Sequence, residues 1–234
     1  MNVLCISCHP DDMEIFCAGT LIKCAKRGDK VTVCHVCNGN MGHVEIMPDE
    51  LGPLRIEEAK KSGALAGFEV LTCNVGDLMA YDSLKEQRDM IVDVIRKTDP
   101  DFIITHSPND YMPDHVAVSK LVFDASFVAS VPHYQSKEKN ASKVTPIFYM
   151  DNDNGIDFVP TEYVDITEEI DLKIEMLKCH ESQYKWLLDH DNIDVTENTR
   201  ALSRLRGFQC NCEYAEGFRQ CLVSPKILPK RMLP

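Results

Sequence analysis

The side chains best able to do chemistry cluster near the start of the chain, in Cys8-His9-Pro10-Asp11-Asp12. A histidine and two adjacent carboxylates supply an imidazole ligand, a carboxylate ligand and a spare carboxylate. Such a stretch can hold a metal ion and still provide a base. One aspartate at a helix start is often only a cap. Capping explains neither the second carboxylate nor the histidine, and we therefore predict a metal-dependent site here.

A second polar stretch, Ser107–His115, follows another apolar run and precedes a predicted helix. If both stretches lie at the same edge of a sheet, His115 meets His9 and Asp12. Two histidines and one carboxylate leave positions open for water and substrate, which is typical of a catalytic metal rather than a structural one. A lone histidine at a helix start is more often a surface or capping residue, so the spacing alone leaves the role of His115 open.

Apolar runs and amphipathic segments alternate around these two stretches, and glycine or proline marks many of their ends. Strands are predicted at 3–6, 31–36, 68–73, 101–106, 146–150 and 163–166, and helices at 13–25, 52–67, 83–98, 116–128, 170–188 and, within 198–221, around 201–206. Residues 130–143 are predicted to be a long loop. We therefore predict an α/β fold: a single domain with a Rossmann-like, doubly wound and mostly parallel sheet, whose carboxyl edge carries both polar stretches.

Bulk composition narrows the classes of function. The 234 residues carry a net charge of −12, which disfavours nucleic acid or an anionic membrane surface as a partner. There is no apolar run of about 18 residues and no basic, then apolar N-terminus, so we expect neither membrane insertion nor secretion. Eleven cysteines, an odd number that lies mostly in apolar runs, indicate reduced core thiols and hence a cytoplasmic protein.

Two CxxC pairs, Cys5–Cys8 and Cys34–Cys37, have the spacing of a four-thiolate zinc site. Each pair, however, lies in or at the end of a predicted strand, where residues i and i+3 point to opposite faces. We therefore predict buried free thiols rather than a zinc knuckle.

The sequence resembles the PIG-L/LmbE-like family of zinc-dependent N-acetylglucosamine de-N-acetylases. The first motif, 8–12 followed by Gly19-Thr20-Leu21, is the most specific, and the resemblance runs to about residue 219. The further segments that are similar to the family are Asn38-Gly39, Arg55–Ala59, Thr105-His106, Asp114-His115, Tyr163–Thr167, Lys173, His180–Gln183 and Tyr214–Arg219. The resemblance implies a PIG-L/LmbE-like deacetylase domain at 1–224, with a short tail at 225–234.

Carried over residue by residue, the resemblance implies that His9, Asp12 and His115 bind Zn²⁺. Asp11 is then the base that takes a proton from the water that the zinc activates. Asp114 is expected to orient its surroundings from behind the ligands.

The resemblance also implies how the substrate is held. Arg55, together with His43, is expected to bind a small amino-sugar substrate, since a guanidinium fork suits hydroxyl and phosphate oxygens. A helix-surface salt bridge is the alternative for Arg55. The expected assembly is a homo-oligomer.

One position departs from the family pattern, because Met112 stands where a histidine is usual. That histidine is expected to stabilise the oxyanion of the tetrahedral intermediate, and a methionine cannot donate a hydrogen bond. One reading is that another group, such as His43, His180 or Tyr111, fills the role. A second is that the enzyme is slow or acts on a substrate whose own groups help. The third is that the chain binds metal without hydrolysis and acts as a binding or sensing protein. We favour retained hydrolysis, because the base and all three ligands are present.

Two further classes are disfavoured. Two histidines and a carboxylate also describe non-haem iron(II) oxygenases, but those sites usually lie on an all-β barrel. A Rossmann-type nucleotide binder is set aside because no G-x-G-x-x-G follows the first strand.

Overall fold

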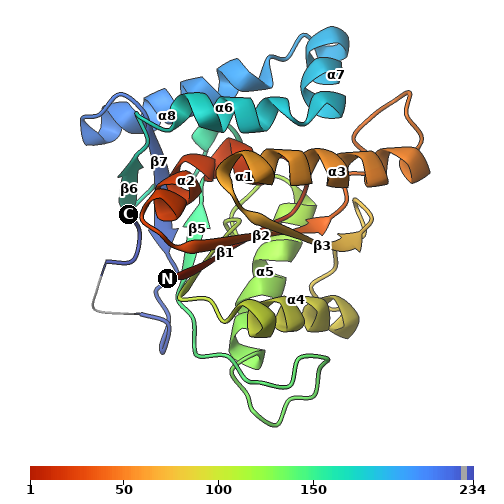
Figure 1. Cartoon of the computed structure of the whole chain (residues 1–234), viewed down its shortest axis with the longest axis vertical. Coiled ribbons are helices and arrows are strands. Elements are labelled where there is room, and N and C mark those ends of the chain that lie inside the picture. The colour runs from red at the N-terminus through yellow and green to blue at the C-terminus, as the bar shows by residue number, and fades with distance from the viewer. Residues whose placement is uncertain (228–230) are drawn as a thin grey trace.

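The predicted apolar runs become strands of one seven-stranded sheet in a computed structural model that describes residues 1–227 and 231–234 (Figure 1). The strands are β1 (Asn2–Ser7), β2 (Lys30–Cys37), β3 (Glu69–Val75), β4 (Phe102–Thr105), β5 (Ile147–Met150), β6 (Glu162–Asp165) and β7 (Ala215–Gln220). Their order is β3-β2-β1-β4-β5-β7-β6. The first five are parallel, whereas β7 runs antiparallel to both of its neighbours. The predicted α/β, doubly wound and mostly parallel sheet is confirmed.

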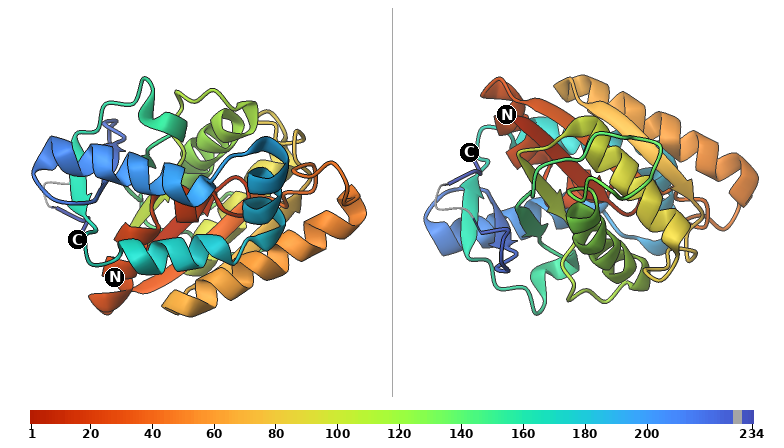
Figure 2. Two further views of the ribbon diagram at one scale, coloured as in Figure 1. Left: turned by 90° about the horizontal axis from the view of Figure 1, so that it is seen from above. Right: turned by 90° about the horizontal axis from the view of Figure 1, so that it is seen from below.

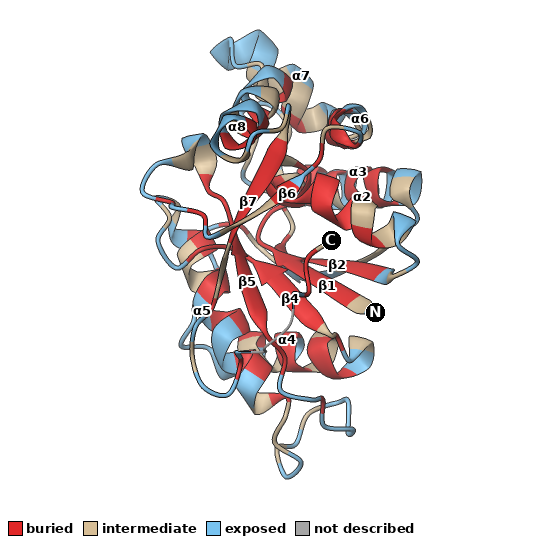
Figure 3. Ribbon diagram, turned by 90° about the vertical axis from the view of Figure 1, so that its left-hand side faces the viewer, coloured by how far each residue is buried: buried red, intermediate tan, exposed pale blue. Residues whose placement is uncertain are grey.

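Helices cover both faces of this sheet, which is why β1 and β4 are buried on both sides (Figure 3). The helices are α1 (Asp12–Phe16), α2 (Ala18–Lys26), α3 (Pro48–Ala66), α4 (Lys85–Thr98), α5 (Pro113–Val128), α6 (Ile170–Lys178), α7 (Glu181–Asp191) and α8 (Val195–Cys210), with a short 3-10 turn η1 (Asp153–Gly155). Helices α4 and α5 pack on one face, and α1, α2, α3 and α6 lie on the other (Figure 1). Helices α6 and α8 run alongside each other, linked through α7 (Figure 2).

Two predicted helices are interrupted, and both breaks have polar causes. The helix predicted at 13–25 divides at Cys17, whose φ of −148° is not helical. The break frees the first amides of α2, and those of Gly19 and Thr20 donate to the Glu216 carboxylate at 2.9 and 2.7 Å. The helix predicted at 170–188 divides before His180, whose ring is fully buried.

The helix predicted around 201–206 is confirmed, but the sequence predicted no strand in the second half of 198–221. Helix α8 ends at Cys210, and β7 follows it as the strand that pairs with both β5 and β6. This pairing joins segments far apart in the sequence, so local spacing could not show it. Helix α5 begins at Pro113 rather than Val116, which places Asp114 and His115 in its first turn.

All eleven cysteines are free, as predicted, and seven of them are buried. Members of the two CxxC pairs turn to partners on other elements: the Sγ–Sγ distances are 3.6 Å for Cys5–Cys17, 3.5 Å for Cys8–Cys37 and 3.8 Å for Cys34–Cys73. Separately, none of the described helices is both long and apolar enough to cross a membrane.

Candidate metal-dependent active site

The two polar stretches meet at the carboxyl edge of the sheet, where β1 lies beside β4. Chain connections leave in opposite directions from this pair of strands, and that position favours a ligand crevice. A cavity of about 700 Å³ opens here. Its floor carries mainly polar side chains, and its outer wall includes apolar side chains of α7 and α8: the lining includes His9, Asp11, Asp12, Arg55, Asp77, Tyr111, Met112, Asp114, His115, Asp153, Leu187, Leu202 and Leu205.

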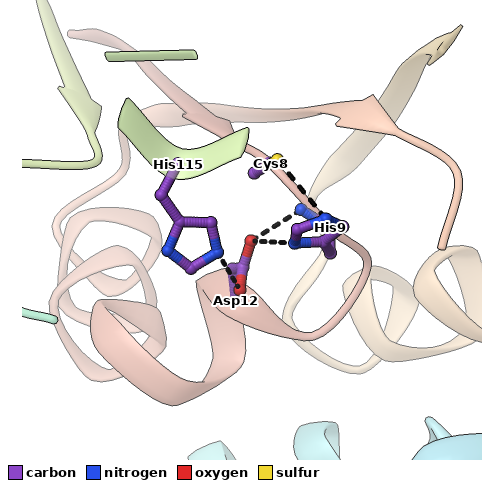
Figure 4. Close-up of side chains that lie close together, drawn as sticks. All are labelled: Cys8, His9, Asp12 and His115. Atoms are coloured by element: carbon purple, nitrogen blue, oxygen red, sulfur yellow. Dashed lines mark hydrogen bonds and ion pairs between the residues drawn. The ribbon is translucent and has the colours of Figure 1, made fainter. Parts of the chain in front are cut away.

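Cys8, His9, Asp12 and His115 form a donor group whose candidate ligand atoms all lie within 4.8 Å of one another (Figure 4). Asp12 stands between the two rings: its Oδ1 is 3.4 Å from His115 Nε2, and its Oδ2 is 3.6 Å from His9 Nδ1. The structure therefore brings the three predicted ligands together and adds Cys8, which the sequence placed in the motif without a role.

This donor group fits a cation. His115 Nε2 is buried and has no hydrogen-bond partner. Burial lowers the pKa of His115, but the charges of Asp12 and Asp110 outweigh burial and raise it to about 10. Burial likewise raises the pKa of Asp12, yet His115 and His106 bring it well below its usual value. The negative charge of Asp12 is thus balanced by the protonated imidazole of His115. A metal ion that bound here would displace the imidazole proton and balance the carboxylate charge instead.

Each ligand histidine also has a carboxylate on its other nitrogen. His9 Nε2 lies 3.3 Å from Asp114 Oδ2, and His115 Nδ1 lies 3.1 Å from Asp110 Oδ2. The backbone N–H of Leu78 donates to Asp114 Oδ2 at 2.7 Å and fixes that carboxylate. Such carboxylates orient metal-binding imidazoles, which is the arrangement expected for Asp114. Sequence reasoning missed Asp110, because its contact five residues along depends on the shape of the loop.

Asp11 is next to this donor group but is not part of it. Its side chain makes no helix-capping hydrogen bond, and its φ of 108° is unusual for a residue other than glycine. Burial raises the pKa of Asp11 to about 6, although the positive charge of Arg55 opposes this effect. A strained, desolvated carboxylate with a pKa near neutrality has the properties of a general base.

Arg55 reaches the floor of the cavity from α3. Its guanidinium donates to Asp11 Oδ2 at 3.0 Å, to the carbonyl of Gly39 at 3.1 Å and to that of Pro10. The side chain is 3% exposed, so the alternative of a helix-surface salt bridge is wrong. Gly39, with φ of 78°, is required here because a Cβ would lie 2.5 Å from Arg55 Nε.

Of the three residues suggested as substitutes for the histidine missing at position 112, Tyr111 lines the cavity together with Met112. His180 is buried behind α1, where it faces Glu14. His43 packs against Trp186, with ring centroids 5.1 Å apart. Its Nδ1 accepts hydrogen bonds from the backbone N–H groups two and three residues further along the chain. His43 is therefore beside the cavity wall formed by Gly42, and its predicted contact with substrate stays a prediction.

Sequence reasoning gave no role to His106 and Asp77. His106 ends the fourth predicted strand, is fully buried, and stacks on His115 with ring centroids 3.9 Å apart. Its Nε2 is 3.2 Å from Asp12 Oδ2. The sequence signal was its position at a strand end on the same sheet edge. Asp77 follows β3 in the same way and accepts the amides of Gly39 and Met41.

Fold and site together define an α/β protein with a group of potential metal ligands at the switch point of its sheet. Comparison with known proteins makes this assignment specific. The sequence profile described as PIG-L, GlcNAc-PI de-N-acetylase, matches residues 4–126, and the chain belongs to this family. The resemblance inferred from the motifs is confirmed.

Similarity to individual proteins extends over nearly the whole chain. A diacetylchitobiose deacetylase of Thermococcus kodakarensis is 28% identical over 232 residues, covering 93% of this chain and 82% of that protein. A 4-oxalmesaconate hydratase of Pseudomonas putida is 24% identical over 236 residues, covering 97% and 90%. The solved structure of N,N'-diacetylchitobiose deacetylase from Pyrococcus horikoshii superposes with a TM-score of 0.80 at 25% identity, covering 93% and 82%.

Proposed function

We propose that this protein is a zinc-dependent hydrolase that removes the acetyl group from an N-acetylated amino sugar, a conjugate of the N-acetylglucosamine type. The observation that carries the proposal is the donor group of His9, Asp12 and His115 with a non-ligating carboxylate, Asp11, beside it in one cavity. Membership of the PIG-L family and similarity to deacetylases support the reaction class.

In this proposal His9, Asp12 and His115 hold Zn²⁺, with Asp114 and Asp110 orienting the two imidazoles. Bound zinc would polarise the amide carbonyl and lower the pKa of water. Asp11 takes the proton of the attacking water and later delivers it to the leaving amine. Arg55 keeps Asp11 in position, and it is also proposed to bind substrate oxygens.

The wider expectations from the sequence join this proposal. We propose one deacetylase domain at 1–224, a cytoplasmic location consistent with its buried free thiols, and a homo-oligomeric assembly. We also propose that His43 contributes to substrate binding through the wall of the cavity.

The test is release of acetate from a panel of N-acetylglucosamine conjugates by zinc-loaded protein, with Asp11→Asn alongside. The amide keeps the shape of the side chain but cannot accept the proton, so turnover should fall by about 10²–10⁴. The zinc content should stay that of the wild type, because Asp11 is not a ligand. Asp82→Asn, an exposed carboxylate away from the cavity, is the matched control and should keep full turnover.

Two results would contradict the proposal. Bound zinc without acetate release from any conjugate would favour the metal-binding, non-catalytic protein suggested by Met112. Addition of water to an unsaturated polycarboxylic acid, assayed in the same panel because one relative is a hydratase, would show that the site activates water for a different reaction.

A further inference from the structure

The thiols of Cys8, which directly follows β1, and Cys37, the last residue of the adjacent strand β2, lie beside the ring of His9. Cys8 Sγ is 3.5 Å from Cys37 Sγ and 3.7 Å from His9 Nε2. Asp114 Oδ2 lies 3.3 Å from that same nitrogen. The candidate ligand atoms of all four residues lie within 4.8 Å of one another. We propose that these four residues form a second binding site, selective for a soft divalent cation such as Cd²⁺ or excess Zn²⁺.

The separations match the edges of a coordination tetrahedron. With zinc–sulfur bonds of about 2.3 Å and zinc–nitrogen or zinc–oxygen bonds of about 2.0–2.1 Å, the S–S, S–N and N–O edges are about 3.8, 3.6 and 3.3 Å. The three corresponding distances in the structure differ from these values by about 0.3 Å or less. A cation therefore needs only small side-chain shifts to reach four ligands.

The chemistry of the donors determines which cations bind. Two thiolates and an imidazole favour zinc or cadmium and disfavour magnesium or calcium, which prefer oxygen. Binding displaces the two thiol protons and the proton on His9 Nε2 to solvent, since the thiolate and the unprotonated imidazole nitrogen are the ligands. His9 and Asp114 line the cavity, so a cation reaches the buried thiols from the side of the active site.

His9 links this second site to the first. Its Nδ1 faces Asp12 in the catalytic donor group, whereas its Nε2 faces Asp114 and Cys8. A cation at the second site takes Asp114 away from the ring that it orients. Occupancy therefore inhibits the enzyme, a consequence that rests on the proposed hydrolysis, although the binding itself does not.

Neighbouring thiols alone do not create such a site. The Sγ atoms of Cys34 and Cys73 are 3.8 Å apart and those of Cys5 and Cys17 are 3.6 Å apart. Among the described residues, neither pair belongs to a group of potential ligands that includes a histidine and a carboxylate. The Cys34–Cys73 pair, in which Cys34 is buried and Cys73 is partly exposed, is therefore a natural control for effects of neighbouring thiols in general.

The experiment is a titration with Cd²⁺, followed by the ultraviolet absorption that arises when a thiolate binds cadmium. The reference protein carries Cys179→Ser, Cys210→Ser and Cys212→Ser, because these three thiols are partly exposed and would add their own signal. We expect saturable thiolate absorption in this protein. It should be lost in Cys8→Ser/Cys37→Ser and retained in Cys34→Ser/Cys73→Ser. Calcium should not compete.

Two outcomes would overturn the proposal: no thiolate absorption at any ratio of Cd²⁺ to protein, or absorption unchanged by Cys8→Ser/Cys37→Ser. If that double variant does not fold, Asp114→Asn decides, because it keeps both thiols and removes one ligand. Cadmium affinity should then fall about tenfold or more, and an unchanged affinity would count against the site. These measurements follow binding alone, so failure of the deacetylase assay would leave their result standing.

Discussion

The roles of the two adjacent aspartates diverge because their surroundings differ. Asp12 lies among imidazoles that hold it ionised, whereas Asp11 is desolvated and is balanced mainly by the charge of Arg55. Environment therefore separates the proposed ligand from the proposed base within one dipeptide. Arg55 acts on the base electrostatically as well as by contact, and this effect can be measured.

The acid limb of kcat/KM should report Asp11. The base works only when ionised, so activity falls as the pH drops through its pKa, which is about 6 and is lowered further by a bound cation. Arg55→Gln removes a charge that lowers this pKa, so the limb should move to higher pH by about one unit or more. Lys60→Gln, an exposed cation on the same helix, should leave the limb in place. An acid limb that Arg55→Gln does not move would exclude Asp11 as the titrating base.

Met112 gives a prediction in the opposite direction, towards gain of activity. Its side chain lines the cavity at the N-terminus of α5, where it can donate no hydrogen bond to an oxyanion. Met112→His should raise the rate of acetate release, by up to about 10²-fold, since removing one such donor costs about 10²–10³. Met41→His, on another part of the lining, should give no gain.

Tyr111 decides between the explanations for this departure. If its hydroxyl already stabilises the oxyanion, Tyr111→Phe loses turnover and Met112→His gains little. If it does not, Tyr111→Phe is neutral and the enzyme is slow as it stands. Equal rates for the wild type, Met112→His and Tyr111→Phe would remove position 112 from the catalytic argument.

At the scale of elements, buried polar contacts hold the short helix α1 against its neighbours. Glu14 is fully buried; Ser62 of α3 donates to its carboxylate, and His180 Nε2, at the start of α7, is 3.0 Å away. Burial lowers the pKa of His180, but Glu14 outweighs burial and raises it above its usual value. Burial raises the pKa of Glu14, and His180 brings it below its usual value.

Removing one partner should therefore be costly. His180→Ala leaves the Glu14 carboxylate buried without its ion pair, which should lower the free energy of unfolding by about 3–5 kcal/mol. The stabilisation from a raised histidine pKa is complete below 6.5 and is lost as the pH rises through the higher folded-state value. That from a lowered glutamate pKa is lost as the pH falls below 4.5. Urea unfolding should therefore show the largest difference in the free energy of unfolding between the wild type and His180→Ala at pH values from 4.5 to 6.5.

His190→Ala is the matched control, because that ring is about half exposed, stacks on Trp186 and pairs with its exposed neighbour Asp191. Its cost should be small at every pH. A His180→Ala variant as stable as the wild type would mean that Glu14 is protonated or hydrated instead of ion-paired.

The elements that sequence reasoning identified are those with strong local patterns. Buried runs such as Phe102–Thr105 and the helix predicted at 52–67, which in the structure begins one turn earlier at Pro48 and ends at Ala66, have a recognisable period, composition or end signal. The breaks at Cys17 and His180 follow from partners on distant elements, Glu216 and Glu14, and leave no local trace. The candidate donors His9, Asp12 and His115 were predicted because each lies in a polar stretch that follows a strand. Asp110 and the thiol of Cys37 were not predicted, because their contacts depend on how distant or looped parts of the chain are arranged.

At the scale of the whole molecule, the strands that lie beyond β5 in the sheet support the helix that forms the outer wall of the site. The order of the first five strands places the cavity at the junction of β1 and β4, and the antiparallel strands β7 and β6 extend the sheet beyond β5. Helix α8 packs on β7 and supplies the apolar wall opposite the metal-binding floor. Arg206 of α8 forms a buried ion pair with Asp151 at 2.5 Å, which fixes this wall to the end of β5.

The end of the chain gives the last prediction, which tests the domain boundary at residue 224. Met232 and Leu233 are each 3% exposed and pack in the core beneath α2, so this part of the predicted tail contributes to the fold. Leu233→Ala should lower the free energy of unfolding by about 2–5 kcal/mol through lost burial and the cavity left behind. Leu222→Ala, 68% exposed, should cost little. A Leu233→Ala variant as stable as the wild type would show that the domain is complete without its last residues, as the boundary at 224 implies.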